Sequence, residues 1–376
     1  MKKISIFFLI CLLIYISWPS IREALGDKTN EHLKEIQSSI EEKDVQGFTE
    51  DAVTAFNQMI INFEQWIQPS PNDSPPAEDE SIEKPALSEP DSQTISVYNF
   101  EIGEKKAEVE NSLGSPQRIT ANEYGSKWHA YHDNYHHFIM ISYDENELIN
   151  GIYTNQDLIT SKNGFQMNMT KEEVTEIFGE PISANRKGIN NYQYANDSNY
   201  ALYEVDDSYL TVFYDIHENN QVTAIQLIGK ELELNKVGFY GEKSAALKEG
   251  FEFQLFDLTN AERVNYRLPT LTWDDPVRQT ARDHSADMAV NNYFGHDNLK
   301  GESPFDRMNA DDILFRTAGE NLAYGQFSSI FAHEGLMNSA GHRKNILKED
   351  YQLLGVGVAF NDDNQPYFTE NFYTKR

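Results

Sequence analysis

The stretch Gly319-Glu320-Asn321-Leu322-Ala323 places an acidic side chain directly after a glycine, in a run of small and apolar residues. Two further stretches place a histidine directly after a glycine: Tyr293-Phe294-Gly295-His296 and Ser339-Ala340-Gly341-His342. Glycine lets the backbone and a ligand come close together, and loops on a rigid scaffold often carry binding groups. The sequence therefore predicts a His, Glu, His set to which three separate elements contribute.

Other blocks of sequence surround these stretches in a fixed order. They are Leu268-Pro269-Thr270-Leu271-Thr272-Trp273, Ala281-Arg282-Asp283-His284-Ser285-Ala286-Asp287-Met288-Ala289, and Gly355-Val356-Gly357-Val358. With these blocks, the chain from about Leu258 to Phe372 resembles the CAP superfamily, also called the cysteine-rich secretory, antigen 5 and pathogenesis-related-1 family. The resemblance implies an α+β fold in which residues 245–376 form an α-β-α sandwich, with helices flanking a small antiparallel sheet.

The resemblance also implies a cleft, because two His and two Glu of the family line a shared cleft that can hold a divalent metal. His296 and His342 match the two histidines, and Glu320 matches the first glutamate. The family's second glutamate corresponds to about Ser339, so this chain has no acid at that position. The nearest acid, Glu334, lies more than a turn earlier, which makes it a doubtful ligand. Bacterial relatives often share this shortened Asn-Ser-x-Gly-His form. The predicted cleft residues are His296, Glu320, Asn321, Ser339 and His342.

The chemistry of this set leaves several functions open. Two imidazoles and one carboxylate are able to bind zinc with a coordination position left open, and calcium is a second candidate. The alternative is a hydrogen-bonded polar cluster in which Glu320 fixes a loop. Nucleophilic catalysis has little support, because the chain has no Gly-x-Ser-x-Gly and only the pair Ser339 and His342 remains to be considered. A metal-assisted hydrolase with Glu320 as general base, together with His296 and His342, is the better enzymatic alternative.

A different role is expected for His284. Val277, Ala281, His284 and Met288 recur at helical spacing after an Asp274-Asp275-Pro276 start. This spacing puts His284 on the apolar face of a helix. We therefore expect a hydrogen-bonded core histidine there rather than a ligand.

Residues 97–234 contain an internal repeat. Ile102–Pro116 recurs as Met169–Pro181, and each copy reads as a short helix that Gly and Pro end. Tyr-rich strands follow both copies, and Phe138–Asp144 matches Tyr209–Asp215. Two copies of a helix-plus-antiparallel-sheet unit are therefore expected. This region resembles an accessory domain that precedes the CAP module in some Gram-positive bacterial proteins.

Four histidines gather in the first copy: His129, His132, His136 and His137. A metal site is one interpretation. Adjacent residues on a strand point to opposite faces, so His136 and His137 are unlikely partners. Polar decoration of aromatic strands is the favoured interpretation.

The N-terminal part of the chain reads as a tether. Lys2 and Lys3 precede an apolar run, and residues 1–21 are expected to form an uncleaved signal anchor with the rest outside the cell. The alternative is cleavage and secretion. Residues 22–68 read as a helical stalk whose segment 29–68 packs on itself or self-associates. Residues 69–96 read as an acidic, Pro-rich linker.

Composition narrows the partners. The formal net charge is −29, which argues against nucleic acid because the excess of Lys and Arg that neutralises phosphate is missing. The single cysteine, Cys11, lies in the apolar run, so no disulfide is expected and the chain resembles the cysteine-free bacterial branch. The favoured function is a non-enzymatic surface module that binds a small ligand, an envelope component or a divalent cation. The alternatives are the hydrolase and a structural, interaction role.

Overall fold

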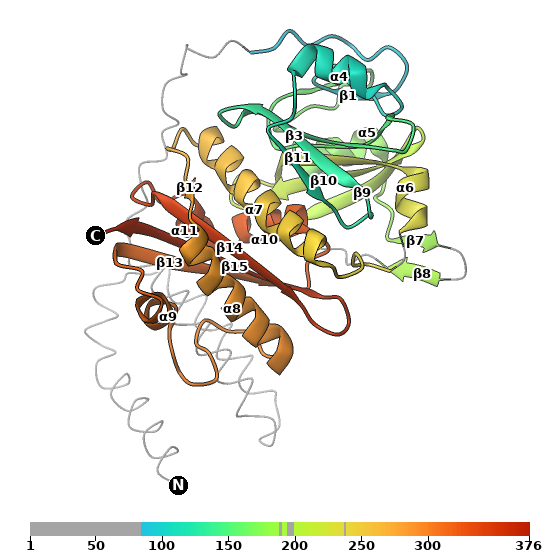
Figure 1. Cartoon of the computed structure of the whole chain (residues 1–376). Helices are drawn as coiled ribbons and strands as arrows, with labels where there is room; N and C mark the ends of the chain where they lie inside the picture. The colour runs from blue at the N-terminus through green and yellow to red at the C-terminus, as the bar shows by residue number, and fades with distance from the viewer. Residues whose placement is uncertain (1–83, 188–189, 194–198, 237) are drawn as a thin grey trace, which may run out of the picture. The chain divides into compact units, whose positions relative to one another are not determined.

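The computed structural model describes residues 84–187, 190–193, 199–236 and 238–376. The expected anchor, the stalk with its self-association, and the first part of the linker lie outside these residues. Within the described part of the chain, no helix combines the length and the apolar character that crossing a membrane requires. The described residues form one compact unit, in which a repeat domain (residues 95–236) and a C-terminal domain (residues 245–376) pack together (Figure 1).

The repeat domain is built on one sheet of seven strands. Its elements in chain order are β1 (Ile95–Val97), α4 (Lys106–Leu113), β2 (Arg118–Ala121), β3 (Lys127–Asp133), β4 (His136–Tyr143), β5 (Ile149–Thr154), β6 (Ile159–Ser161), α5 (Lys171–Phe178), β7 (Ala184–Lys187), β8 (Asn190–Gln193), β9 (Tyr200–Val205), β10 (Ser208–Asp215), β11 (Gln221–Gly229) and α6 (Lys230–Asn235). The order of the large sheet is β2-β3-β4-β5-β11-β10-β9, while β1 pairs with β6 and β7 with β8.

The internal repeat is visible in this order. Strands β3, β4 and β5 form one antiparallel meander, β9, β10 and β11 form the other, and the antiparallel pair β5 and β11 joins them. The expected two helix-plus-sheet units are therefore halves of a single sheet. Joining them pairs two strands that would otherwise be exposed edges.

The helices of the two repeats also match in detail. Both end at a glycine with positive φ, Gly114 at 77° and Gly179 at 79°, a conformation that other residues rarely adopt. Each buries one valine completely, Val109 in α4 and Val174 in α5. A capping box formed by Thr170 and Glu173 begins α5.

The C-terminal domain alternates long helices with strands. Its elements are α7 (Ala245–Asn265), β12 (Thr272–Trp273), α8 (Asp275–Asn291), α9 (Pro304–Ala310), β13 (Phe315–Tyr324), α10 (Ser329–Met337), α11 (Ala340–Ile346), β14 (Leu353–Phe360) and β15 (Pro366–Lys375). The sheet order is β12-β14-β15-β13, so β13 is an edge strand. The side chain of Ser244 caps the start of α7.

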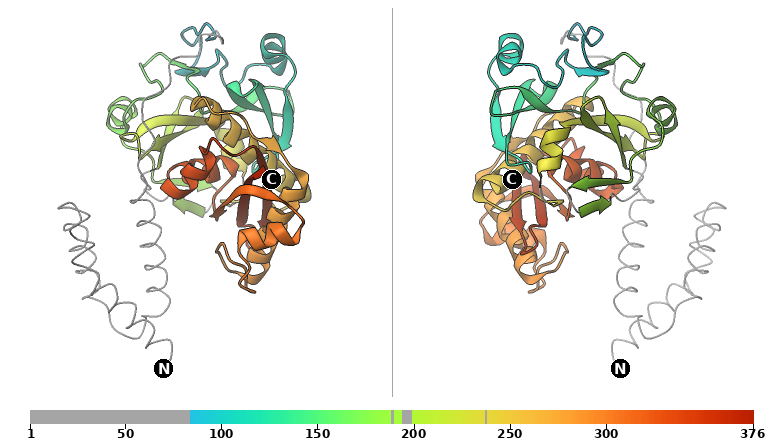
Figure 2. Two further views of the ribbon diagram at one scale, coloured as in Figure 1. Left: turned by 90° about the vertical axis from the view of Figure 1, so that its left-hand side faces the viewer. Right: turned by 90° about the vertical axis from the view of Figure 1, so that its right-hand side faces the viewer.

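Helices cover both faces of this sheet, as the α-β-α expectation requires. On one face α8 packs on β14 and β15, and α9 packs beside β13. Helices α7, α10 and α11 cover the opposite face, where Val356 and Val358 of β14 join their apolar side chains (Figures 1 and 2). The α8 face needs small residues, because a Cβ on Gly357 would lie 2.1 Å from the backbone nitrogen of Arg282.

Helix α7 is buried on two sides, since it lies between the two domains. Leu247, Phe251 and Leu255 belong to the core of the C-terminal domain. One turn further on, Leu258 and Ala261 enter a second core together with Ile330 of α10 and side chains of the repeat sheet. The repeat sheet supplies Trp128, Phe138, Met140, Tyr153, Phe213 and others to this shared core. The two domains therefore have a common hydrophobic interface.

Candidate functional site

The carboxylate of Glu320 is the centre of the site. Glu320 lies on the edge strand β13, and its side chain is only 1% exposed. Its Oε1 accepts a hydrogen bond from Nδ1 of His296 at 2.9 Å, and its Oε2 accepts one from Nη2 of Arg307 at 2.7 Å. Burying an ionised carboxylate is costly unless it is paired, and Arg307 supplies the opposite charge.

Arg307 fixes more than the carboxylate. It lies on α9, and its Nη1 donates to the backbone oxygens of His296 at 2.7 Å and Glu302 at 2.9 Å. One guanidinium therefore holds both Glu320 and the loop that carries His296. Sequence reasoning missed Arg307. The available signal was that a buried glutamate needs a cationic partner, and Lys300, Arg307 and Arg316 were the cations between His296 and Glu320.

His296 presents its ring to solvent. Helix α8 ends at Asn292 in the left-handed conformation, and the chain then turns toward β13. The side chain of His296 is 51% exposed, although its Nδ1 faces Glu320. A carboxylate acceptor at Nδ1 favours the tautomer with the proton there, which leaves a lone pair on the outward Nε2.

His342 lies on α11 and completes the pair of imidazoles. Burial, and to a lesser extent charge repulsion from the nearby His296, lower its pKa to about 4. The repulsion requires the two rings to lie within electrostatic range of each other. At neutral pH His342 is therefore uncharged, and it is able to donate or accept a hydrogen bond through its ring.

Asn321 occupies the other face of the strand. It is completely buried, and its Nδ2 donates to the backbone oxygen of His342 at 3.2 Å and to Glu370 at 3.1 Å. Its Oδ1 accepts from Asn345 of α11 at 2.9 Å. Asn321, which the sequence predicts as a cleft residue, holds the backbone of the helix that carries His342.

Ser339 and Glu334 are placed differently from each other. Ser339 is partly exposed at the N-cap of α11, and its side chain makes no capping hydrogen bond. Glu334 is buried in α10, and its Oε1 accepts a 2.8 Å hydrogen bond from the hydroxyl of Tyr153 in the repeat domain. Its hydrogen bond and its electrostatic neighbours, Glu262 and Asp215, belong to the domain interface. The structure does not bring Glu334 to the pair formed by His296 and Glu320.

The contacts of Glu320 decide whether the site can hold a resident metal ion. In the described residues, no group of three or more His, Cys, Asp or Glu side chains is arranged to hold a metal. Both oxygens of Glu320 already have partners, Arg307 and His296, which leaves two imidazoles. Catalytic zinc sites use three protein ligands and calcium sites use six to eight oxygens. The residues therefore do not fit a resident zinc or calcium site with Glu320 as ligand.

Three other histidines, His129, His132 and His284, have local contacts outside the candidate site. Nε2 of His284 lies 3.0 Å from the backbone oxygen of Gly295, and the residue is buried, which confirms the expected core histidine. In the repeat domain, Nδ1 of His132 accepts from the backbone nitrogen of Tyr135, and the two rings stack. His129 packs edge-on against Tyr143. Burial lowers the pKa of His129 and of His132 to about 4.

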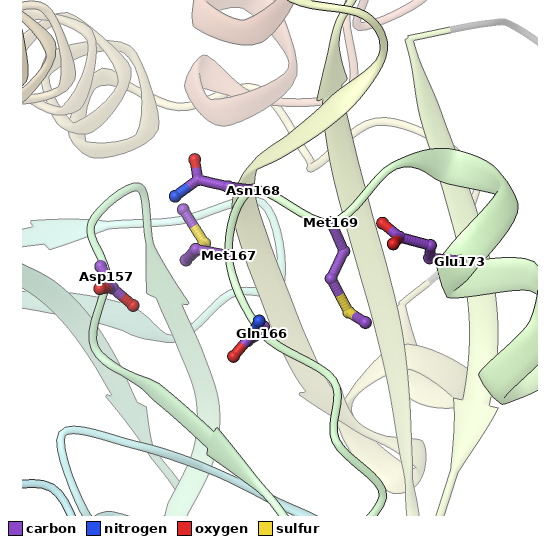
Figure 3. A pocket seen from close by; sticks show the side chains of 6 residues that line it. All are labelled: Asp157, Gln166, Met167, Asn168, Met169 and Glu173. Carbon is purple, nitrogen blue, oxygen red and sulfur yellow. The ribbon is translucent and has the colours of Figure 1, made fainter.

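A separate pocket of about 360 Å³ lies in the repeat domain. Its lining residues are Asp157, Gln166, Met167, Asn168, Met169 and Glu173 (Figure 3). Glu173 belongs to α5, and the other five come from the chain between β5 and that helix. None of the predicted site residues lines this pocket.

Comparison with known proteins agrees with this architecture. Residues 256–372 match the cysteine-rich secretory protein family, known as CAP, and residues 102–239 match the CAP-associated N-terminal family. The C-terminal domain belongs to the CAP family. The family expected from the sequence is confirmed, and so is the accessory domain before it.

Two relatives come from Bacillus subtilis strain 168. The uncharacterized membrane protein YlbC is 29% identical over 297 residues, which cover 72% of this chain and 82% of YlbC. The uncharacterized protein YkwD is 43% identical over 125 residues, 33% of this chain and 48% of YkwD.

Two solved structures are similar to this chain over about three quarters of its length. An extracellular protein containing an SCP domain from Bacillus anthracis strain Ames has a TM-score of 0.64 and 27% identity, covering 78% of this chain and 100% of the other. A cysteine-rich secretory protein from Staphylococcus aureus has a TM-score of 0.58 and 16% identity, covering 76% and 95%. The second likeness shows the fold alone.

Proposed function

We propose that this chain is a membrane-tethered extracellular protein whose CAP domain is a non-enzymatic binding module. The cleft beside His296 and His342 would receive a small polar ligand or a component of the cell envelope. The tether is supported by Lys2, Lys3 and the apolar run after them, and by the name of YlbC as a membrane protein. The extracellular location is supported by the description of the Bacillus anthracis protein.

The observation that carries the proposal is the chain of contacts from Arg307 through Glu320 to His296. It holds one half-exposed imidazole in a fixed orientation by way of a buried carboxylate and a nearly buried guanidinium. Holding a surface side chain in one orientation has an entropic cost, and fixing it in advance reduces the cost of binding a ligand. An outward imidazole nitrogen is a hydrogen-bond acceptor for hydroxyl and amide groups.

A divalent cation is the weaker candidate for this cleft. It would find two imidazoles and water, because Glu320 is bound to Arg307. The contact with Arg307 also changes the roles of the residues in the hydrolase alternative. With both oxygens engaged, Glu320 is poorly placed to take a proton from water, so in a hydrolase it would orient His296, and His296 would be the base.

The test is a thermal-shift series on the full-length protein. The probes are zinc chloride, calcium chloride and soluble fragments of bacterial cell wall. We expect cell-wall fragments to raise the melting temperature of the wild type but not that of the variant carrying His296→Ala and His342→Ala. The matched control is His136→Ala, a partly exposed histidine of the repeat domain, which should respond like the wild type.

An equal response in the double variant would place binding elsewhere, and no response of the wild type to any probe would overturn the proposal. Release of soluble products from the fragments by the wild type, lost in His296→Ala, would favour the hydrolase.

A further inference from the structure

The short segment Asn338–Arg343 carries the two cleft positions Ser339 and His342, and it is in contact with the repeat domain at both ends. At its start, Asn338 is 8% exposed. Its Oδ1 accepts from the backbone nitrogen of Ile216 at 2.8 Å, and its Nδ2 donates to the backbone oxygen of Tyr214 at 2.9 Å. The amide thus continues the hydrogen bonding of the turn between β10 and β11.

At the other end of the segment, Arg343 forms a charged contact with the same turn. Its Nη1 donates to Oδ2 of Asp215 at 2.6 Å, and Nη2 lies 3.5 Å from Oε1 of Glu218. The side chains of Arg343 and Asp215 are 14% and 6% exposed. Charge-assisted bonds in such a protected place are stronger and more directional than exposed ion pairs.

A third contact involves the backbone of the segment. Nε2 of His217 lies 3.1 Å from the backbone oxygen of Asn338. The turn residues Tyr214–Glu218 therefore touch the segment before Ser339 and after His342. On the inner side, Asn321 binds the backbone oxygen of His342, so the repeat domain and β13 hold this segment between them.

We propose that the repeat domain positions His342, and that Asp215, Asn338 and Arg343 are the positioning residues. The segment joins the end of α10 to the start of α11 beside the edge strand β13, and the contacts with the repeat domain add to the one that β13 makes with it. In the shortened Asn-Ser-x-Gly-His form, the role of the asparagine, Asn338, is then to bind the repeat domain. The significance of this for ligand binding rests on the proposed function, but the positioning itself does not.

The test measures how fast diethyl pyrocarbonate modifies each histidine of the full-length protein, with peptide mass spectrometry as the readout. The assay needs no ligand. His296, which is half exposed, is the internal reference for a reactive ring, and His333, which is completely buried, is the reference for an unreactive one. In the wild type we expect His342 to react more slowly than His296.

The variants are Asp215→Asn, which is isosteric, and Asn338→Ala. Each should raise the modification rate of His342 by about tenfold, equivalent to about 1.4 kcal/mol, with the rate of His296 unchanged. The matched control is Arg118→Gln. Arg118 also bridges the two domains, through a 2.8 Å contact with Asp257 of α7, but it lies on a different part of the interface.

An unchanged His342 rate in both variants would overturn the proposal. So would an equal increase in Arg118→Gln, because that would indicate general loosening of the interface. If one variant fails to fold by circular dichroism, the other decides. The two proposals can fail separately. If the modification rate of His342 rises in the variants but no probe binds in the thermal-shift series, the proposed function is wrong and the positioning role remains.

Discussion

Arg307 donates a 2.7 Å hydrogen bond to Oε2 of Glu320, and this contact sets the chemistry of the cleft. It neutralises a carboxylate that is only 1% exposed and occupies one of its two oxygens. The remaining oxygen orients His296. In the structure, the expected His, Glu, His set therefore contains an imidazole, that of His296, which a buried and paired carboxylate holds in one orientation.

Loss of Arg307 should therefore be strongly destabilising. Arg307→Ala leaves the buried Glu320 without its cation, and we expect the free energy of unfolding to fall by about 3 kcal/mol. Urea denaturation measures this. The control is Arg316→Ala, because Arg316 is exposed and its loss should change stability by less than about 0.5 kcal/mol. A double-mutant cycle with Glu320→Gln should show strong coupling, and additive effects would contradict the pairing.

The same contact predicts the response to zinc. Arg307→Gln frees one oxygen of Glu320, which then joins His296 and His342 as a third ligand. We expect zinc affinity to rise by about tenfold or more over the wild type, measured by calorimetry on protein purified without a histidine tag. Adding Glu320→Gln to the variant should remove the gain. Tight zinc binding by the wild type itself would show that the ion displaces Arg307.

The members of the site that sequence could identify are those marked by a local pattern. His296 and His342 follow glycines, and Glu320 stands in a run of small residues, so the resemblance located all three. Arg307 has no such mark. Its role depends on how α9 packs beside β13, at a distance of 13 residues from Glu320 along the chain.

Strand geometry separates the side chain of Asn321 from that of Glu320. Consecutive side chains on a strand point to opposite faces, so Glu320 and Asn321 point to opposite faces of β13. The contacts agree, since Glu320 binds Arg307 of α9 whereas Asn321 binds Asn345 of α11.

The sequence did not predict that the two repeats join into one sheet. Each copy offered equivalent strands, and nothing local specifies that β5 pairs with β11. The pairing of Ile152 with Leu227 follows from burying both edges and from the shared core with α7, which are properties of the assembled domains.

Two glycines should respond in opposite directions to alanine. A Cβ at Gly357 would lie 2.1 Å from the backbone of α8, so Gly357→Ala should cost about 1–3 kcal/mol or more by forcing the helix away from the sheet. Gly335 lies in α10, where a Cβ would meet only the side chain of Gln326 at 3.7 Å. Gly335→Ala should stabilise by about 0.5–1 kcal/mol through helix propensity. Denaturant midpoints give both signs, and a stable Gly357→Ala protein would argue against the tight contact between α8 and β14.

The domain interface should weaken as the pH rises, because it buries acids. Burial, and to a lesser extent the nearby charge of Glu262, raise the pKa of Glu334 to about 8. Burial likewise raises the pKa of Glu262 to about 7. A carboxyl group whose pKa is higher in the folded state than its unfolded value of 4.5 contributes stability below pH 4.5. That contribution is lost as the pH rises to about 8.

Glu334→Gln imitates the protonated acid, so the variant should lose less stability than the wild type between pH 5.5 and pH 8.5. We expect the difference to be roughly 1–4 kcal/mol, measured as the change in the free energy of unfolding in urea at the two pH values. The matched control is Glu145→Gln at an exposed position, which should follow the wild-type profile. If Glu334→Gln keeps the full wild-type pH dependence, then Glu334 is ionised in the folded protein at neutral pH, and its contact with Tyr153 is a hydrogen bond to a buried charge.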